Sequence, residues 1–117
     1  MKNKCKMKLS ELINITGLNS VTDVFEPDKE ITGAYTSDLL SDVIANSKKD
    51  QIWITLQTHQ NIVAVASLKE IAAIVIVMDK DIGADTLEKA NSEKITILRT
   101  GLTAFQISGM IYESGIK

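Results

Sequence analysis

The sequence predicts an α/β fold of three layers, in which a mainly parallel sheet carries helices on both faces. Two observations lead to this prediction. Short runs rich in β-branched residues alternate with segments of helical periodicity along most of the chain, which is typical of parallel strands joined by helices. Residues 73–78 are apolar throughout, as in strands covered on both faces. With 117 residues, 44% of them hydrophobic, the chain has the size and composition of one globular domain.

The first predicted element is a helix over residues 9–16. Its apolar residues follow helical spacing, and Ser10 is available as a cap. Gly17 follows at the position where a left-handed residue commonly ends a helix. Residues 21–25 are short and β-branched, and Pro27 comes soon after them. We therefore expect a strand over 21–25.

A second extended segment is expected to end at Ile31 and Thr32, where Gly33 turns the chain. A helix follows, because a hydroxyl or carboxylate among residues 36–38 can accept a hydrogen bond from its free N–H groups. The polar residues 46–50 end this helix. Its apolar stripe contains Leu39, Leu40, Val43 and Ile44.

The alternation continues with a strand over 51–56 and a polar loop that holds the only histidine, His59. The next segment is ambiguous. Its β-branched residues favour a strand, whereas Asn61 is a good helix cap and five later residues favour a helix: Ala64, Ala66, Leu68, Lys69 and Glu70. We choose a helix over 61–70, because a helix completes the alternation.

The last part of the sequence predicts two strands and two helices. After the apolar strand 73–78, a helix extends to about residue 93, and a strand follows over 95–98. Gly115 ends the final helix. Capping-box spacing marks the two helix starts, with Asp85 and Glu88 at the first and Thr103 and Gln106 at the second.

Charge and apolar runs exclude two classes of partner. The formal net charge of −2 shows no electrostatic footprint for nucleic acid. The longest apolar run, 71–78, is far too short to span a bilayer, so we expect no membrane contact.

Four lysines make residues 1–8 a basic, solvated extension before a single domain over 9–117. Cys5 is the only cysteine, which leaves no intramolecular disulfide and agrees with a cytoplasmic protein.

A candidate site follows from the expected sheet, since ligands of open parallel sheets bind beyond the carboxyl ends of the strands. Four polar segments are expected to meet there, three of which lead into helix N-termini that suit anions. An arginine at a strand end can also bind a phosphate or carboxylate through two parallel hydrogen bonds. Each residue has a structural alternative as a helix cap, a turn residue or an ion-pair member. The ligand-binding candidates are Thr32, Gly33, Ser37, His59, Asn61 and Arg99.

No catalytic arrangement is recognisable in the sequence. It has no phosphate-binding loop of the GxxxxGK[ST] type, no GxSxG elbow and no HExxH pair. Asp79 and Asp81 resemble half of a cation site, but two loop carboxylates alone are usually solvated. We therefore expect no catalytic residues, no metal ligands and no cofactor. A hydrolase or transferase with His59 as general base is the alternative.

Three segments in order resemble the DRTGG domain family: DKEITGAYTSDLLSDV over 28–43, WITLQTHQNIVAVASLKEIAAIVIV over 53–77, and TLEKANSEKITILRTGLTAFQISGMIYESG over 86–115. The resemblance implies an α/β domain similar to the N-terminal domain of HPr kinase/phosphorylase, without kinase chemistry of its own. Such domains also accompany CBS pairs, inorganic pyrophosphatases and phosphotransacetylases as accessory parts.

The motif that names the family corresponds here to Asp28, Lys29, Thr32 and Gly33. Lys29 replaces an arginine, which keeps the charge but loses the planar fork, and Ala34 replaces a second glycine. The resemblance implies a non-catalytic regulatory or protein-interaction module. We expect a homo-oligomer with a possible protein partner, packed through the last helix around Gly109, because the sequence has large apolar side chains at Trp53, Phe105, Met110 and Tyr112. The alternative is a sensor that binds a nucleotide or other small anion at the carboxyl edge of the sheet.

Overall fold

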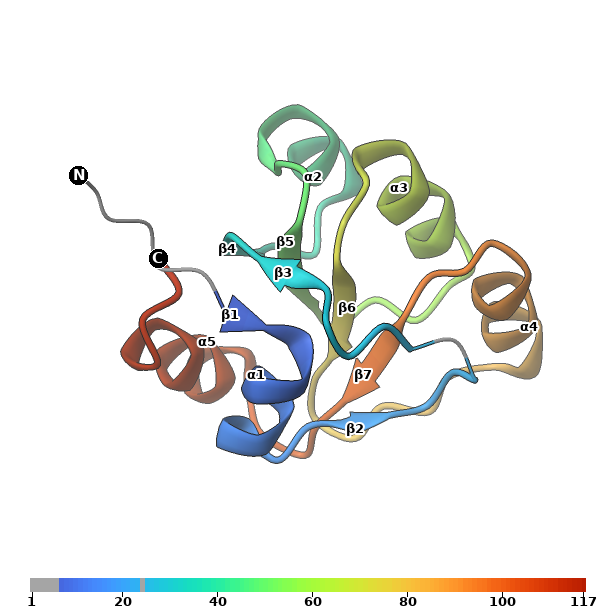
Figure 1. Cartoon of the computed structure of the whole chain (residues 1–117). Helices are drawn as coiled ribbons and strands as arrows, with labels where there is room; N and C mark the ends of the chain where they lie inside the picture. Colours follow the sequence, from blue (N-terminus) through green and yellow to red (C-terminus); the bar gives the residue numbers. More distant parts are fainter. Residues whose placement is uncertain (1–6, 24) are drawn as a thin grey trace.

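The structure is a computed structural model that describes residues 7–23 and 25–117, and Figure 1 shows the arrangement of its elements. The helices are α1 (Leu9–Thr16), α2 (Leu40–Asn46), α3 (Asn61–Lys69), α4 (Ala84–Ser92) and α5 (Ala104–Glu113). The strands are β1 (Met7–Lys8), β2 (Asn19–Ser20), β3 (Glu30–Ile31), β4 (Gly33–Thr36), β5 (Gln51–Thr55), β6 (Ala73–Ile76) and β7 (Ile97–Arg99).

The main sheet has the strand order β2-β7-β6-β5-β4. Strands β4 to β7 are parallel neighbours in chain order, with Thr36 opposite Ile54 and Thr55 opposite Ile76. Only β2 is antiparallel, at the edge beside β7. A separate antiparallel pair joins β1 to β3. This mixed, mostly parallel sheet confirms the predicted α/β class.

Two apolar layers separate the sheet from its helices. Helices α1 and α5 cover one face, where Ile54, Val75 and Leu98 of the sheet are fully or almost fully buried. Helices α2, α3 and α4 cover the other face, which includes the buried Trp53 and Ile74. Figure 1 shows the two groups of helices on opposite sides of the central strands. The alternation of Trp53 and Ile54 between the two layers follows from the period of two in a strand.

The three crossovers from β4 to β7 all use the same face of the sheet. Helices α2, α3 and α4 connect these strands in turn, and all three pack on one side. After β7 the chain passes to the opposite face, where it forms α5. The loop after β6 therefore leads to one face of the sheet and the loop after β7 leads to the other.

Most predicted elements are confirmed, including α1 with Gly17 in the left-handed conformation at φ 74 and the ambiguous segment as α3. The predicted strand over 21–25 is wrong. Thr22 and Asp23 form a bend, Val21 and Phe25 lie in no regular element, and the strand lies earlier, at Asn19–Ser20. Residue 24 lies outside the described residues. Local β-propensity was misleading here, because pairing with β7 selects the strand residues.

Several expected boundaries and caps also differ. Met7 and Lys8 belong to β1, whereas residues 1–6 of the expected extension lie outside the described part of the chain. The Lys8 backbone N–H donates to the Glu11 carboxylate (2.9 Å) at the start of α1, so Ser10 is not the cap. Only the last helix has the expected reciprocal side-chain cap, in which Thr103 receives a hydrogen bond from the N–H of Gln106.

The apolar stripe of α2 is only partly buried. Val43 is fully buried, but Leu39 is 65% exposed and Ile44 is 41% exposed. The sheet ends at its edge strand β4 beside α2, so the sheet can cover only part of this apolar stripe.

Among the helices of the described residues, none combines the length and the apolar composition needed to cross a membrane.

Candidate functional site at the carboxyl edge of the sheet

A pocket opens at the carboxyl ends of β4, β5 and β6. Its volume is about 300 Å³, near the lower end of the range for small-molecule sites. We call it the carboxyl-edge pocket. Three loops contribute its walls, which contain an acid, an imidazole, an amine, an amide, a hydroxyl and one apolar side chain. The lining residues are Asp38, Leu56, Gln57, Thr58, His59 and Lys80.

His59 has a defined hydrogen-bonding state. The backbone N–H of Asn61 donates to its Nδ1 atom over 3.1 Å, and the N–H of Ile62 donates to its carbonyl oxygen over 3.0 Å. An Nδ1 that accepts a hydrogen bond leaves the proton of the neutral ring on Nε2. His59 therefore caps α3 through one nitrogen and has a donor on the other. The hydroxyl of Thr86 donates to the carbonyl of Thr58 (2.9 Å) and ties this loop to α4.

Asp38 is held in place by groups at the end of β5. Its Oδ1 atom accepts hydrogen bonds from the buried Thr55 hydroxyl (2.9 Å) and from the Leu56 N–H (2.7 Å). The Gln57 side-chain amide donates to the Asp38 carbonyl over 3.0 Å. The second carboxylate oxygen, Oδ2, has no hydrogen bond from the described residues. A carboxylate has more acceptor capacity than two hydrogen bonds use, so Asp38 can also receive hydrogen bonds from a ligand.

Lys80 supplies the positive charge of the pocket. It lies in the exposed loop between β6 and α4. Its ammonium group has no ion-pair partner within residues 7–23 and 25–117. The pocket thus presents two kinds of hydrogen-bond donor, the Lys80 ammonium and the His59 Nε2–H, together with the Asp38 carboxylate as an acceptor. Such a set can bind an anion that also has hydroxyl groups.

Ser37 lies next to the pocket but has structural partners. Its hydroxyl accepts a hydrogen bond from the Leu39 N–H (3.2 Å), and its carbonyl accepts one from the Trp53 indole N–H (2.9 Å). A hydrogen bond from Ser37, followed by those from Tyr35 and Asn46, lowers the pKa of Asp42 below its usual value. These interactions place Ser37 at the start of α2 as a structural residue.

Arg99 lies in ion pairs rather than in the pocket. Its Nη2 atom donates to the Asp79 carbonyl over 2.7 Å, and its guanidinium lies 4.0 Å from the Asp79 carboxylate and 3.8 Å from that of Asp81. The backbone N–H of Asp79 also donates to the carbonyl of Thr100 (2.9 Å). Ligands of open α/β sheets usually bind outside the carboxyl ends of two neighbouring strands whose following loops lead to opposite faces of the sheet. In this fold those strands are β6 and β7, and the contacts of Arg99 with Asp79 and Asp81 lie there.

Thr32 and Gly33 lie at the opposite edge of the sheet, so their expected position at the carboxyl edge was wrong. Gly33 begins β4 and is opposite Gln51, the first residue of β5. The Thr32 N–H donates to the Asp50 carbonyl (3.1 Å), and its hydroxyl donates to the carbonyl of Lys49 (3.3 Å). Gly33 is the first residue of β4, two residues after β3 ends at Ile31, so it opens a strand rather than turning the chain after one. About 10 Å of extended backbone separates it from the carboxyl end of β4.

The segment that resembles the family signature forms an interaction at this amino edge. The ammonium of Lys29 lies 2.8 Å from the Asp50 carboxylate, and its carbonyl accepts the Leu9 N–H over 2.8 Å. The hydrogen bond to Asp50 raises the pKa of Lys29 despite some loss of hydration. Lys29 therefore connects the start of α1 to the start of β5. Its role in the described structure is to fix these elements rather than to line the pocket.

The structure brings together only part of the predicted site. His59 lines the pocket, Ser37 precedes the lining residue Asp38, and Asn61 donates its backbone N–H to His59. Thr32, Gly33 and Arg99 lie elsewhere. Asp38 and Lys80 were missed as ligand contacts. Lys80 belongs to segment 79–81, one of the four post-strand segments expected at this edge, but it was not chosen as a ligand contact. Asp38 was interpreted as a possible helix cap.

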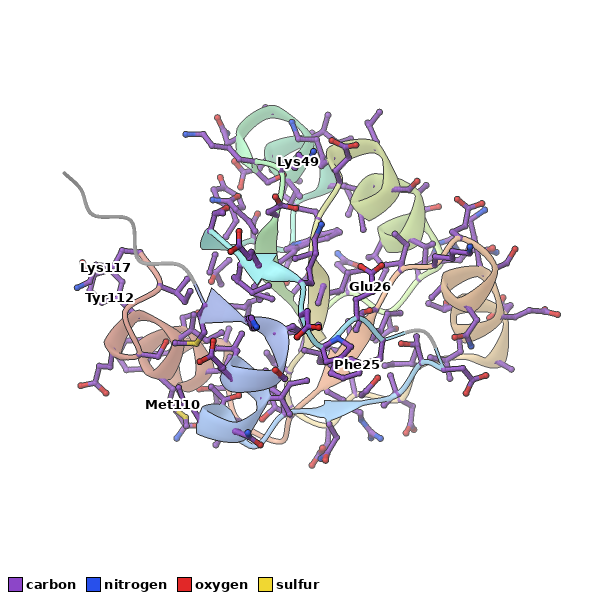
Figure 2. All side chains as sticks on the ribbon, viewed as in Figure 1. Phe25, Glu26, Lys49, Met110, Tyr112 and Lys117 are labelled. Atoms are coloured by element: carbon purple, nitrogen blue, oxygen red, sulfur yellow. The ribbon has the colours of Figure 1, made fainter. Side chains whose placement is uncertain are left out.

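A second hollow, of about 220 Å³, lies between β4 and α5. Its walls are mainly apolar, and the hydroxyls of Thr36 and Ser108 hydrogen-bond to each other within it (2.8 Å). Lys117 lies 4.8 Å from the centre of the Tyr112 ring, and Figure 2 shows both side chains near the end of α5. Lys117 also lines this hollow, but its ammonium lies over the Tyr112 ring, and none of the lining side chains is acidic. No cluster of three potential metal ligands occurs among the described residues.

Comparisons with known proteins show the fold. No family model matches the sequence, and the search of curated proteins found no match. The fold is similar to that in the crystal structure of the CBS and DRTGG domains of the regulatory region of Clostridium perfringens pyrophosphatase, complexed with the activator diadenosine tetraphosphate. The TM-score is 0.74 at 15% sequence identity, and the match covers 93% of this chain and 47% of that chain. This chain therefore spans about half the length of that structure, and the likeness establishes a shared α/β fold.

Proposed function

We propose that residues 9–117, with β1, form a non-catalytic, DRTGG-like regulatory module of the cytoplasm that binds a small anionic ligand at the carboxyl-edge pocket. The observation that carries this proposal is that Lys80, which has no ion-pair partner among the described residues, and His59, whose Nε2 is left as a donor, line one pocket. A nucleotide or another phosphate is the ligand class with matching charge.

The pocket suits binding better than catalysis. The Nδ1 atom of His59 is occupied by a backbone N–H, so this nitrogen lacks the carboxylate partner that orients a catalytic histidine in a triad. No hydrogen bond between a nucleophilic side chain and His59 is present among the described residues. Both features favour a role for His59 as a positioned donor over a role as general base.

The fold comparison and the sequence resemblance also support a regulatory role. The similar crystal structure belongs to a regulatory region and contains an activator that is a nucleotide. The resemblance to DRTGG domains, and through them to the N-terminal domain of HPr kinase/phosphorylase, leads in the same direction. We infer that this module passes a binding signal to another protein or domain, as an accessory part rather than as an enzyme.

The direct test is a thermal-shift and calorimetric screen of nucleotides, sugar phosphates, inorganic phosphate and small carboxylates. A ligand at about 100 times its dissociation constant would stabilise the protein by about 2.7 kcal/mol. Lys80→Gln should abolish most of this stabilisation. Lys48→Gln is the matched control, since Lys48 is also exposed but lies at the amino end of β5.

A second variant separates ligand binding from the cap of α3. His59→Asn keeps a side-chain acceptor for the Asn61 N–H and removes the Nε2 donor. Weaker ligand binding with an unchanged melting temperature of the free protein would support the proposal. Equal stabilisation of the wild-type, Lys80→Gln and His59→Asn proteins by every anion would refute the pocket as the site.

A homo-oligomeric interaction module is the second candidate, and exposed aromatic side chains on α5 favour it. Phe105 is 88% exposed and Tyr112 is 59% exposed, and the apolar hollow between β4 and α5 lies on the same side of the molecule. Sedimentation at tens of micromolar tests this candidate. A wild-type dimer that Phe105→Gln converts to monomer would support it, whereas a wild-type monomer would exclude it at that concentration.

A further inference from the structure

We infer that the carboxyl-edge pocket selects a phosphorylated sugar or a ribonucleoside 5′-monophosphate, with the phosphate at Lys80 and His59 and the sugar hydroxyls at Asp38. This inference rests on the proposed function and specifies the ligand. It concerns a compound with a single phosphate group and adjacent hydroxyls, rather than anions in general.

The first argument is the mixed charge of the pocket. Asp38 lines the same pocket as Lys80 and His59, and its carboxylate repels any anion that approaches it without a hydrogen-bond donor. The Oδ2 atom is free of hydrogen bonds from the described residues. A ligand that brings hydroxyl donors to this oxygen turns the repulsive group into an attractive one. Inorganic phosphate alone has poorer complementarity, because its oxygens are mainly acceptors at neutral pH.

The second argument is that the acceptor and one donor are positioned before a ligand arrives. Two hydrogen bonds from the end of β5 hold the Asp38 carboxylate, and the Asn61 N–H fixes the tautomer of His59. Groups held in this way lose little conformational freedom on binding. A fixed acceptor in the same pocket as the donors favours a ligand whose hydroxyls and phosphate are joined by a short, stiff framework, as they are in a pentose phosphate.

The third argument is size. The pocket has a volume of about 300 Å³, and at the neighbouring ends of β6 and β7 Arg99 forms ion pairs with Asp79 and Asp81. One sugar phosphate or mononucleotide is therefore a better match than a dinucleotide. The side chain of Leu56, which is 36% exposed, provides an apolar surface in the wall for the sugar or the base.

The test compares four compounds by isothermal titration calorimetry: ribose 5-phosphate, 2-deoxyribose 5-phosphate, ribose and inorganic phosphate. Ribonucleoside and deoxyribonucleoside 5′-monophosphates form a second matched pair. We expect ribose 5-phosphate or a ribonucleotide to bind best. Its 2-deoxy counterpart should bind about tenfold more weakly, as the loss of one hydrogen bond to a charged group implies.

Two variants assign the contacts. Asp38→Asn keeps an oxygen for Thr55 and Leu56 while it removes the charge, and should bring the ribose-to-deoxyribose ratio close to one. Lys80→Gln should weaken every phosphorylated compound and leave that ratio unchanged. The controls are Asp28→Asn and Lys48→Gln, because neither residue lines the pocket and Asp28 is highly exposed.

The outcomes separate this inference from the proposed function. Binding of a ribose phosphate with Asp38-dependent discrimination supports both. Lys80-dependent binding of anions without any preference for the 2-hydroxyl overturns the ligand assignment and retains the anion sensor. Stabilisation of the wild-type protein by none of these compounds overturns the ligand assignment, and if the wider anion screen also fails, the proposed function fails with it.

Discussion

Replacement of Asp38 tests whether the pocket acid also supports the fold. Asp38→Ala removes the acceptor of two hydrogen bonds, one from the Thr55 hydroxyl and one from the Leu56 N–H. Thr55 is only 1% exposed, so the loss of the acceptor for its hydroxyl should lower the free energy of unfolding by about 1–3 kcal/mol. Loss of the acceptor for the more accessible Leu56 N–H should lower it by about 0.5–1.5 kcal/mol. The expected loss is therefore about 1.5–4.5 kcal/mol in the free energy of unfolding.

The same residue offers a control. Asp38→Asn keeps an acceptor oxygen and should cost less than about 1 kcal/mol. Urea unfolding can be followed through Trp53, the only tryptophan, which is fully buried. For 117 residues, about 1.5–4.5 kcal/mol corresponds to a fall of roughly 6–18 °C in melting temperature. A change below about 0.5 kcal/mol for Asp38→Ala, within the usual effect of a surface substitution, would refute the account of these hydrogen bonds. Equal losses for Ala and Asn would do the same.

Two further predictions concern stability. Lys29→Gln should lower the free energy of unfolding by about 0.5–1 kcal/mol at neutral pH, through loss of the partly exposed ion pair with Asp50. Because that partner raises the pKa of Lys29 above 10.5, the wild-type advantage is complete below this value and should vanish in urea titrations carried out well above it. Gly17→Ala should cost about 1 kcal/mol because φ is positive there, whereas Gly109→Ala, inside α5 with open space around it, should stabilise the monomer by about 0.5–1 kcal/mol. Paired melting curves in which both glycine variants move the same way would contradict this account.

The fold was predictable because its signals are local. Apolar period and capping residues identified α1, α3, α5 and the buried strands β5 and β6, and alternation of strands with helices implies a parallel sheet. The strand over 21–25 failed for the opposite reason. Its residues have β-propensity, but the edge position beside β7 is taken by Asn19–Ser20, and propensity is a weak guide where pairing decides.

The candidate site was less predictable, because it depends on contacts between distant segments. His59 was identified as a post-strand residue, and it does line the pocket. Arg99 also follows a predicted strand, but Asp79 and Asp81 of the neighbouring loop lie close enough to form ion pairs with it. Asp38 could not be recognised, since a helix cap and an acid held at the end of β5 look alike in sequence.

Residues 28–33, which resemble the family signature, show most clearly what the local sequence could not predict, namely the position of a segment within the sheet. By itself the sequence determined the α/β class, the order of most elements and the polar character of the post-strand loops, because these follow from neighbouring residues. Only the tertiary structure decided that Gly33 opens β4 rather than closing a strand, opposite Gln51. The register of that pairing places Thr32 and Lys29 at the amino edge beside Asp50 and leaves the pocket to Asp38, His59 and Lys80. Strand register is a non-local property, since a shift along the partner strand moves side chains to another edge or face while the local sequence stays the same.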